Sequence, residues 1–498
     1  MRDNIETELK LRIAPARVRS AIEVLTRISG TEPRINQLDA QYYDTKTAKL
    51  WRLGYAFRVR REEDAFVQTL KCQNGVDPLS RSEWSHRASA ISPDILSAAM
   101  TRRVRGLIGT SALVPKFRVQ VSRSIFTIRG ADRASIEVAV DVGQIITPDG
   151  ARERICELEL ELKSGAPWAI YRAALRLCER IDCALEPQSK SARGHGLLRD
   201  TPKVARLDPP AFKPSTLLDE ALRQAARRYF AQFIANVPLM MKGDATAVHM
   251  MRVAVRRLRS AIAAAKPFLA PAAAEKANVQ LRSIQQSLGA LRDFDVLSAG
   301  LATHDSGKSG ANKGRRDLAE WVDRRRRTAM SNAERAVGSK EQTLAWLRSM
   351  EWLESLDRAG RRAARSATPL RRAVPVMLDR LFKRVRKRGR NVAGQNPTEL
   401  HRLRIACKKL RYGLELFRSL YAAKDVAAML RPLKALQEDL GTLNDTHVAR
   451  PVLGAGKASD KALQYARLRL SRMERQAAAA TTNAARRMER LKRSDKFW

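Results

Sequence analysis

Two segments of the sequence alternate charged and apolar residues in a way that could bind metal ions. Residues 156–163 read CELELELK, and residues 5–12 read IETELKLR. Because successive side chains of a β-strand point to opposite faces, each segment would gather its charged groups on one face. Carboxylates at neighbouring positions of one face repel one another unless cations lie between them. Their oxygens suit hard divalent ions, so we expect a Mg²⁺ or Mn²⁺ site.

Basic residues are arranged by the same rule. Arg58 and Arg60 share one face of a predicted strand, and Lys71 ends the next strand. Guanidinium and ammonium groups bind phosphate oxygens. If acidic and basic strands enclose one polar interior, the interior would bind a polyanion that chelates a divalent metal. An amphipathic sheet whose charged face simply meets water is the alternative that this pattern leaves open.

The elements that carry these residues predict an α+β domain over residues 1–200. Period-two alternation indicates strands at 4–13, 55–61, 65–71, 117–129, 135–142 and 154–163, and helical spacing indicates helices at 15–29, 93–109 and 167–181. Four prolines then fall within residues 201–215, which we interpret as a linker.

Residues 216–498 form a different, all-helical part that contains an internal repeat. HMMRVAVRRLR at 249–259 aligns with HRLRIACKKLR at 401–411, and LGALRDFDV at 288–296 aligns with LGTLNDTHV at 440–448. Both pairs have the same offset of 152 residues. We therefore predict two four-helix bundle repeats, at about 216–360 and 370–498.

Positive charge is concentrated in the repeats. The net charge is +42, of which residues 1–200 contribute +8 and residues 201–498 contribute +34. On a helix, His249, Arg252, Arg256 and Arg259 fall within an arc of roughly 80°. Like charges so placed destabilise a helix unless an external anion binds them, although a solvated basic face is the alternative. An anionic partner is expected.

Further motifs give the first part a family resemblance. Glu6-Thr-Glu8-Leu-Lys10 matches the ExExK motif of the CYTH superfamily, the triphosphate tunnel metalloenzymes. Other elements follow in the family's order: Tyr42–Thr45, Leu50, Gly54, Phe57–Arg60, Gln68–Lys71, Glu83-Trp84, Ile136–Gly143, Glu157–Glu161 and Ser189–Gly194. The resemblance implies an eight-stranded antiparallel β tunnel with flanking helices, which binds triphosphates and hydrolyses them with a divalent metal.

Site residues follow from that resemblance. The implied metal ligands are Glu6, Glu8, Asp141, Glu157, Glu159 and Glu161. The implied phosphate clamp consists of Arg58, Arg60, Lys71, Arg118, Arg123, Lys190 and Arg193. Lys10 is expected to orient or deprotonate the attacking water, so Lys10, Glu6 and Glu8 are the predicted catalytic residues.

The second part resembles the CHAD domain, a helical module with two four-helix halves. Both repeats carry its His-x-x-Arg and Leu-Gly-x-Leu-x-Asp motifs. The resemblance implies binding of inorganic polyphosphate. The residues it implies are His249, Arg252, Arg256, Arg257 and Arg259 in the first repeat and His401, Arg404, Lys408, Lys409 and Arg411 in the second.

Together these features predict a metal-dependent inorganic triphosphatase that hydrolyses tripolyphosphate and carries a polyphosphate-binding domain. The alternatives are another CYTH activity, such as nucleoside or thiamine triphosphate hydrolysis or adenylyl cyclisation, and a binding protein without catalysis. Nucleic acid is a weaker candidate partner, because an aromatic content of 5% offers few residues for base stacking.

The expected location is the cytoplasm, in association with polyphosphate granules. The sequence contains no apolar run of the length that spans a bilayer and begins without a signal peptide. Its five cysteines form neither a disulfide framework nor a zinc motif. No membrane partner is therefore expected, and the oligomeric state is open.

Overall fold

The computed structural model describes residues 4–62, 65–73, 79–88, 98–200, 203–302, 309–357, 365–454 and 460–498. They divide into two compact units. One comprises Met1–Arg206 with Phe230–Met251 and Ala336–Ser355, and the other comprises Leu207–Tyr229, Arg252–Arg335 and Leu356–Trp498.

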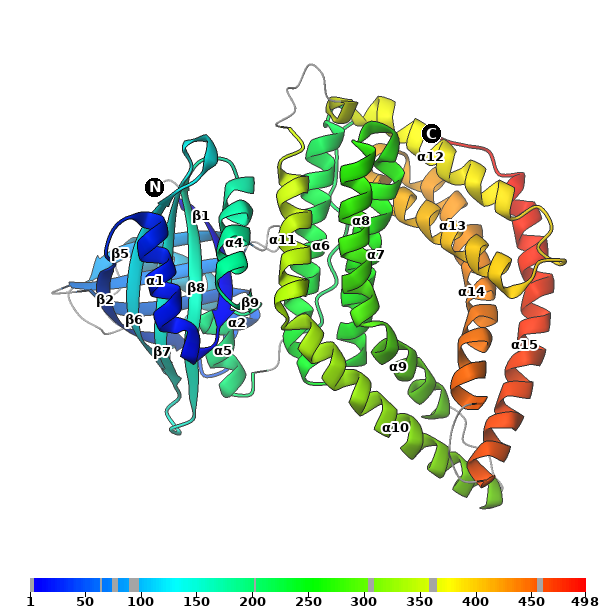
Figure 1. The fold of residues 1–498 in the computed structure, drawn as a ribbon, viewed down its shortest axis with the longest axis horizontal. Helices are drawn as coiled ribbons and strands as arrows, with labels where there is room; N and C mark the ends of the chain where they lie inside the picture. The colour runs from blue at the N-terminus through cyan, green and yellow to red at the C-terminus, as the bar shows by residue number, and fades with distance from the viewer. Residues whose placement is uncertain are drawn as a thin grey trace. The chain divides into compact units, whose positions relative to one another are not determined.

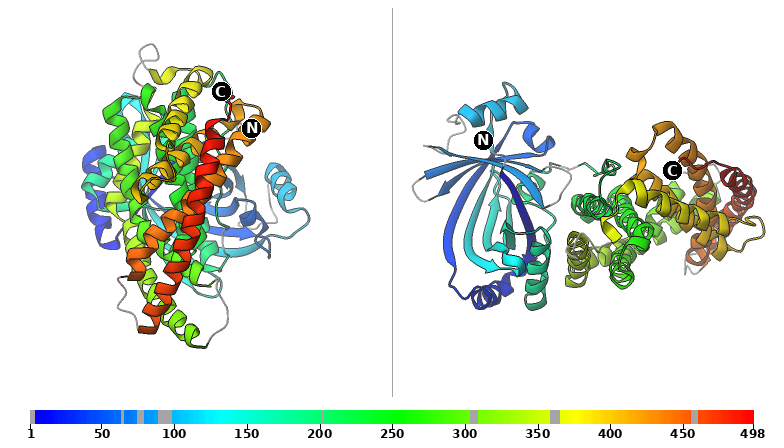
Figure 2. Two further views of the ribbon diagram at one scale, coloured as in Figure 1. Left: turned by 90° about the vertical axis from the view of Figure 1, so that its right-hand side faces the viewer. Right: turned by 90° about the horizontal axis from the view of Figure 1, so that it is seen from above.

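A closed antiparallel barrel forms the first part of the chain (Figure 1). Its strands are paired in the order β5-β4-β3-β2-β6-β7-β8-β1, and a further pairing of β1 with β5 closes the ring. Figure 2 shows the strands curving around the interior. The predicted eight-stranded α+β fold is confirmed. The strands are β1 (Asn4–Ile13), β2 (Arg34–Asp44), β3 (Tyr55–Glu62), β4 (Ala65–Gln73), β5 (Ser80–Ala88), β6 (Val114–Arg129), β7 (Ser135–Ile146) and β8 (Arg152–Ser164), and the short β9 (Cys183–Leu185) pairs with β1.

Helices cover the apolar outer face of the barrel. Phe57 and Val59 of β3 are fully buried and pack in one cluster with Leu50, Met100 and Val104 from the covering helices. Since side chains alternate along a strand, Arg58 and Arg60 consequently point inward. The helices of this part of the chain are α1 (Val18–Ser29), α2 (Lys49–Arg52), α3 (Ala98–Ile108), α4 (Trp168–Arg180) and α5 (Lys190–Leu197), of which α5 contributes to the interior rather than to the outer cover. Residues 93–97 of the predicted helix 93–109 lie outside the described residues.

Helix α5 is held against the inner face of β6 by a close contact. A Cβ atom on Gly194 would lie 2.3 Å from Cε2 of Phe117, whose ring is buried and stacked on Tyr42. The helix begins at the Ser189 N-cap, whose Oγ accepts a hydrogen bond from the backbone N–H of Ala192 at 3.1 Å. This start places Lys190 in the first turn of α5.

The contact predicts a stability difference between two glycines of the same helix. Gly194→Ala is expected to destabilise the protein by about 1–3 kcal/mol, because the added methyl group overlaps a buried ring. Gly196→Ala is the matched control: its Cβ meets nothing within 4 Å, and alanine favours a helix by up to ~1 kcal/mol over glycine. Chemical denaturation of both variants measures the difference. Equal stability of the two would contradict this packing.

The second part of the chain is helical and repeats at the offset read from the sequence (Figure 1). Helices α6, α7 and α8 begin at residues 218, 245 and 271, and α12, α13 and α14 begin at 370, 397 and 423. The helices are α6 (Leu218–Met241), α7 (Ala245–Ala265), α8 (Pro271–Ser287), α9 (Gly289–Ala302), α10 (Ser309–Val337), α11 (Lys340–Glu354), α12 (Leu370–Arg388), α13 (Pro397–Leu416), α14 (Ala423–Gly454) and α15 (Asp460–Lys492).

The two repeats differ at two helices. The segment that α14 spans without interruption corresponds to both α8 and α9 of the first repeat, which are separated at Leu288. Counting α8 and α9 as one broken helix, the second repeat contains four helices and the first contains five, because α11 follows α10 in the first repeat alone. Helices α14 and α15 run side by side. Within the described part of the chain, no helix combines the length and apolarity that crossing a membrane requires.

Candidate functional sites

A charged cavity of about 1250 Å³ occupies the interior of the barrel. Its walls carry side chains from nearly every strand and from α5. Strands β3, β4 and β6 contribute only cations, β7 contributes only carboxylates, and β1, β5 and β8 contribute both signs. Most of the predicted tunnel residues line it. These are Glu6, Glu8, Lys10, Arg58, Arg60, Lys71, Arg123, Asp141, Glu159, Glu161 and Lys190.

Three carboxylates from β7 and β8 form the acidic wall. Asp141 lies opposite Glu157 in the strand register, and one oxygen each of Asp141, Glu157 and Glu159 lies within 4.8 Å of the others. Lys190 Nζ is 2.6 Å from Asp141 Oδ2 and 2.8 Å from Glu159 Oε1, and it also contacts Glu157. Clustered carboxylate oxygens are the donors that Mg²⁺ and Mn²⁺ prefer, so this wall fits a divalent metal.

These carboxylates stay ionised although they are buried. Asp141 and Glu157 are fully buried. Burial raises the pKa of each, but Lys190 and other nearby cations outweigh burial and hold the pKa below its usual range. Arg123 contributes at Asp141 through a bidentate pair, Nε to Oδ1 at 2.7 Å and Nη2 to Oδ2 at 2.6 Å. The site therefore offers charged ligands at neutral pH.

Strand β1 brings an amine beside the acidic wall. Lys10 faces Glu159 across the β1–β8 ladder and contacts both Glu159 and Glu8. Burial lowers the pKa of Lys10 to about 8, with Glu8 opposing the shift and Lys190 adding to it. Burial raises the pKa of Glu8, but Lys10, Arg81 and Lys71 bring it well below the usual value. Lys10 can therefore exchange a proton near neutral pH while Glu8 remains a carboxylate.

The basic wall comes from β3, β4 and β6. Burial, together with the nearby Arg58 and Arg123, lowers the pKa of Arg60 to about 9. This shift shows how densely positive charge is packed there. Lys71 lies 2.6 Å from Glu6 and 2.8 Å from Glu83. The wall presents several phosphate donors that face the acidic strands across one cavity.

Two predicted clamp residues lie outside the cavity lining. Arg118 is on the outer side of β6, where its half-exposed guanidinium donates to Asp39 Oδ1 at 2.6 Å. Arg193 follows Lys190 by three residues on α5, but its guanidinium is held by Glu153 at 2.6 Å and Glu157 at 3.1 Å. Glu157, a predicted metal ligand, is buried behind the cavity surface beside Lys190.

Residues of β5 also line the cavity without having been assigned a role from the sequence. Arg81 lies 3.5 Å from Glu8, and Glu83 pairs with Lys71. Burial raises the pKa of Glu83, but Lys71 and Arg58 lower it to about 2. The sequence signal for both residues was their separation by two positions, which puts the side chains of Arg81 and Glu83 on one face of β5. Lys71 lies opposite Glu83 in the β4–β5 ladder, so its side chain lies on the same face of the sheet.

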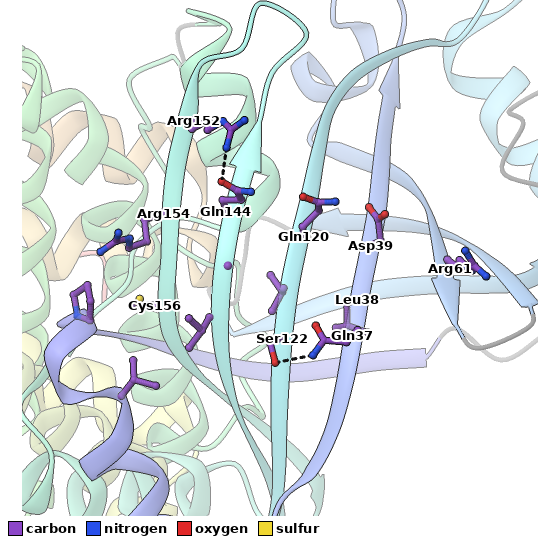
Figure 3. A pocket seen from close by; sticks show the side chains of 15 residues that line it. Gln37, Leu38, Asp39, Arg61, Gln120, Ser122, Gln144, Arg152, Arg154 and Cys156 are labelled. Carbon is purple, nitrogen blue, oxygen red and sulfur yellow. Dashed lines mark hydrogen bonds between the residues drawn. The ribbon is translucent and has the colours of Figure 1, made fainter.

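A second groove, on the outer face of the barrel, has a different character (Figure 3). Its polar side chains are largely satisfied by one another: Gln37 donates to Ser122 at 3.1 Å, and Arg152 donates to Gln144 at 3.5 Å. No predicted site residue lines this groove. The chemistry therefore concentrates in the interior cavity.

In the helical part, cationic stripes of the two repeats adjoin. The guanidinium of Arg256 on α7 lies 5.4 Å from the ring centre of Tyr412 on α13, and that of Arg411 lies 5.0 Å from the same ring. Burial lowers the pKa of Lys408 to about 7, and Arg256, Arg404 and Arg411 add to the shift. Cations predicted from two motifs 152 residues apart thus form one group, which we call the central cluster: Arg256, Arg404, Lys408 and Arg411.

The Leu-Gly-x-Leu-x-Asp motifs hold an arginine of each stripe in place. Arg252 donates to the backbone carbonyl of Gln285 at 3.1 Å, and its Nη1 lies 3.5 Å from where a Cβ on Gly289 would be. Arg404 has the equivalent position beside Gly441 and lies 4.0 Å from Asp445. The guanidinium of each stripe thus packs beside the glycine of the second motif, so the two motifs of each repeat adjoin.

The histidines of the stripes lie at the helix starts. His401 Nδ1 is 2.7 Å from Asn444 Oδ1, which ties α13 to α14. His249 lies on α7, one turn before Arg252. Arg257 and Lys409 lie beside the stripes on α7 and α13, and Arg259 is one turn beyond Arg256.

Comparison with known proteins identifies both parts. Residues 4–193 match the family model of the CYTH domain, and residues 224–454 match that of the CHAD domain. The chain carries a CYTH domain followed by a CHAD domain. The barrel cavity is thus the interior of a CYTH tunnel, and the paired cationic stripes belong to the CHAD domain.

Similar proteins include relatives of both domains. An uncharacterized protein of Mycobacterium tuberculosis is 24% identical over 93% of this chain and 91% of its own length. The CHAD domain of the plant Ricinus communis is 26% identical, covers 58% of this chain and 96% of its own, and superposes with a TM-score of 0.50. A Hippeastrum protein described as a candidate adenylyl cyclase with a dominant triphosphatase activity is 18% identical, covers 38% of this chain and 95% of its own, and has a TM-score of 0.29.

Proposed function

We propose that the CYTH domain is a metal-dependent inorganic triphosphatase that hydrolyses tripolyphosphate to phosphate and diphosphate. The observation that carries the proposal is the arrangement of charge inside one closed cavity, where the carboxylate cluster of β7 and β8 shares the cavity with cations of β3, β4 and β6 and with the mixed charges of β1 and β5. A triphosphate with bound divalent metal has the complementary pattern, because phosphate oxygens seek cations and the metal seeks carboxylates.

The chain's own residues would divide the work as follows. Arg58, Arg60 and Lys71 bind and orient the phosphate chain by charge-assisted hydrogen bonds. Glu8 and the acidic wall would hold Mg²⁺ or Mn²⁺, which supplies neutralisation of the phosphate oxygens and acidifies a bound water. Lys10, with a pKa lowered to about 8, accepts a proton from the water that attacks the terminal phosphorus. The bond from that phosphorus to the bridging oxygen then breaks, and diphosphate leaves.

Variants of the two walls should separate catalysis from binding. Glu8→Gln is expected to lower kcat for tripolyphosphate by about 10²-fold or more, because it removes a charged group from the reacting centre. Arg58→Gln should raise KM by about ten-fold, since a charge-assisted hydrogen bond contributes ~1.5–3 kcal/mol. Arg118→Gln, outside the cavity, is the control and should change neither. Phosphate release measured with Mg²⁺ and with Mn²⁺ tests all three; wild-type kinetics for Glu8→Gln would contradict the assignment.

We also propose that the CHAD domain binds inorganic polyphosphate. The supporting observation is that two cations of the central cluster lack an acidic neighbour. Among the described residues, no carboxylate lies within 4.0 Å of Arg256 or Lys408. Arg256 Nε and Arg404 Nε are buried without a hydrogen-bond partner. A chain of phosphates would satisfy these groups, and it would place the protein at polyphosphate granules in the cytoplasm.

Lys408 should make polyphosphate binding depend on pH. Its pKa of about 7 in the free protein means that the ammonium loses its proton as the pH rises above 7, whereas a bound polyanion favours the charged form. The affinity is therefore expected to fall with rising pH from about 7, by up to ~10-fold per pH unit. Titration calorimetry of the full chain at several pH values measures this. Lys408→Arg stays charged and should lose the dependence; an unchanged profile would contradict it.

A further inference from the structure

The 152-residue offset pairs the basic residues that flank the central cluster. Arg257 of α7 corresponds to Lys409 of α13, and Arg259 corresponds to Arg411. If the repeats were equivalent, the site would have two equal flanks. We call Arg257 and Arg411 the Glu415 flank, after the acid that contacts both; Arg411 belongs to this flank as well as to the central cluster. Arg259 and Lys409 are the Lys409 flank. The two differ in how their charge is compensated.

The Glu415 flank is partly neutralised, because one carboxylate lies between its two guanidinium groups. Glu415 Oε2 lies 3.6 Å from Arg257 Nη2, and Glu415 Oε1 lies 3.5 Å from Arg411 Nε. The Glu415 side chain is 17% exposed, so the pairs are largely shielded from water. The residue 152 positions earlier is Ala263, so the first repeat has no counterpart to this acid. An incoming phosphate on this flank would meet a carboxylate between the two guanidinium groups.

The Lys409 flank keeps its positive charge. Arg259 is held by neutral groups, Asn278 Oδ1 at 3.0 Å and Gln285 Oε1 at 2.7 Å. Burial lowers the pKa of Lys409, and the nearby Arg384, Arg259 and Arg282 lower it further, opposed by the exposed Glu275. Throughout the described part of the chain, no carboxylate lies within 4.0 Å of these four cations.

Helices α8 and α12 extend this flank outward. Arg282 and Arg384 are both exposed, on α8 and α12, and both act on Lys409. The position equivalent to Arg384 in the first repeat is Gln232, which is buried and donates to the carbonyl of Met250. Arg384 therefore has no basic counterpart in the first repeat, whereas Arg282 corresponds to the exposed Lys434.

We propose that a bound polyphosphate chain leaves the central cluster across the Lys409 flank, where Arg282 and Arg384 bind further phosphates, while Glu415 turns it away from the opposite flank. The inference rests on the proposed binding of polyphosphate and adds its direction. The bound chain would distinguish the two flanks because uncompensated cations attract it on one side and a carboxylate repels it on the other.

Charge-matched variants at equivalent positions test this direction. Arg282→Gln and Arg384→Gln should each weaken binding of a long polyphosphate chain roughly two- to five-fold and leave a short chain, confined to the central cluster, unaffected. Lys434→Gln is the control. Lys434 is exposed and lies 152 residues after Arg282, so this variant removes one positive charge at the equivalent position of the other repeat. It should change neither affinity. The slope of log affinity against log salt should fall by about 0.7 for each lost contact.

Removing the acid tests the reverse effect. Glu415→Gln frees Arg257 and Arg411 and should strengthen long-chain binding. All affinities are measured on the full chain by titration calorimetry with chains of two defined lengths, and thermal unfolding of each variant verifies its fold. Equal losses for Arg282→Gln and Lys434→Gln, or equal losses for both chain lengths, would overturn the proposed direction. If wild type binds neither length, or if Arg256→Gln binds as wild type does, polyphosphate binding itself fails.

Discussion

Enclosing charge inside a closed barrel is the constraint on which the CYTH domain depends. Because strands alternate their faces, burying Phe57 and Val59 under helices on the outside turns Arg58 and Arg60 inward. The same alternation turns the acidic faces of β1 and β8 inward. An unpaired buried charge is destabilising by several kcal/mol, so each wall is tolerable only because the other faces it. A metal-bound triphosphate carries both positive and negative charge. It can therefore take the place of the ion pairs between the two walls without leaving a buried charge unpaired.

The CHAD domain handles charge in the opposite way. Its central cluster gathers cations from two repeats beside Tyr412, and the cluster's buried nitrogens include several without partners. Burial and that crowding together lower the pKa of Lys408. A duplicated cationic helix face offers a long anion more contacts than one face could. In the proposed complex, the acid at Glu415, which has no counterpart in the first repeat, would give the bound chain a preferred side.

Most of the tunnel residues could be predicted from the sequence, because the face of a strand that a side chain occupies depends only on whether its position is odd or even. Glu6, Glu8 and Lys10 share a face by spacing alone, and so do Glu157, Glu159 and Glu161. Arg118 shows the same rule: it is five residues from Arg123, an odd number, so the two face opposite sides of β6.

Other features depended on contacts between segments far apart in the chain. Arg193 is occupied by Glu153 and Glu157, which spacing within α5 does not show. In the same way, the offset of 152 predicted both stripes, but only packing of α7 against α13 shows that Glu415 partly neutralises one flank.

If the charge pattern of the barrel serves a metal-bound triphosphate, as proposed, turnover of tripolyphosphate must depend on a divalent metal. The full chain is incubated with tripolyphosphate and with Mg²⁺, Mn²⁺ or a chelator, and the release of phosphate and diphosphate is followed. We predict equal amounts of the two products, formed with a divalent metal and abolished by the chelator. Absence of turnover with either metal, or turnover that persists in the chelator, would contradict the claim.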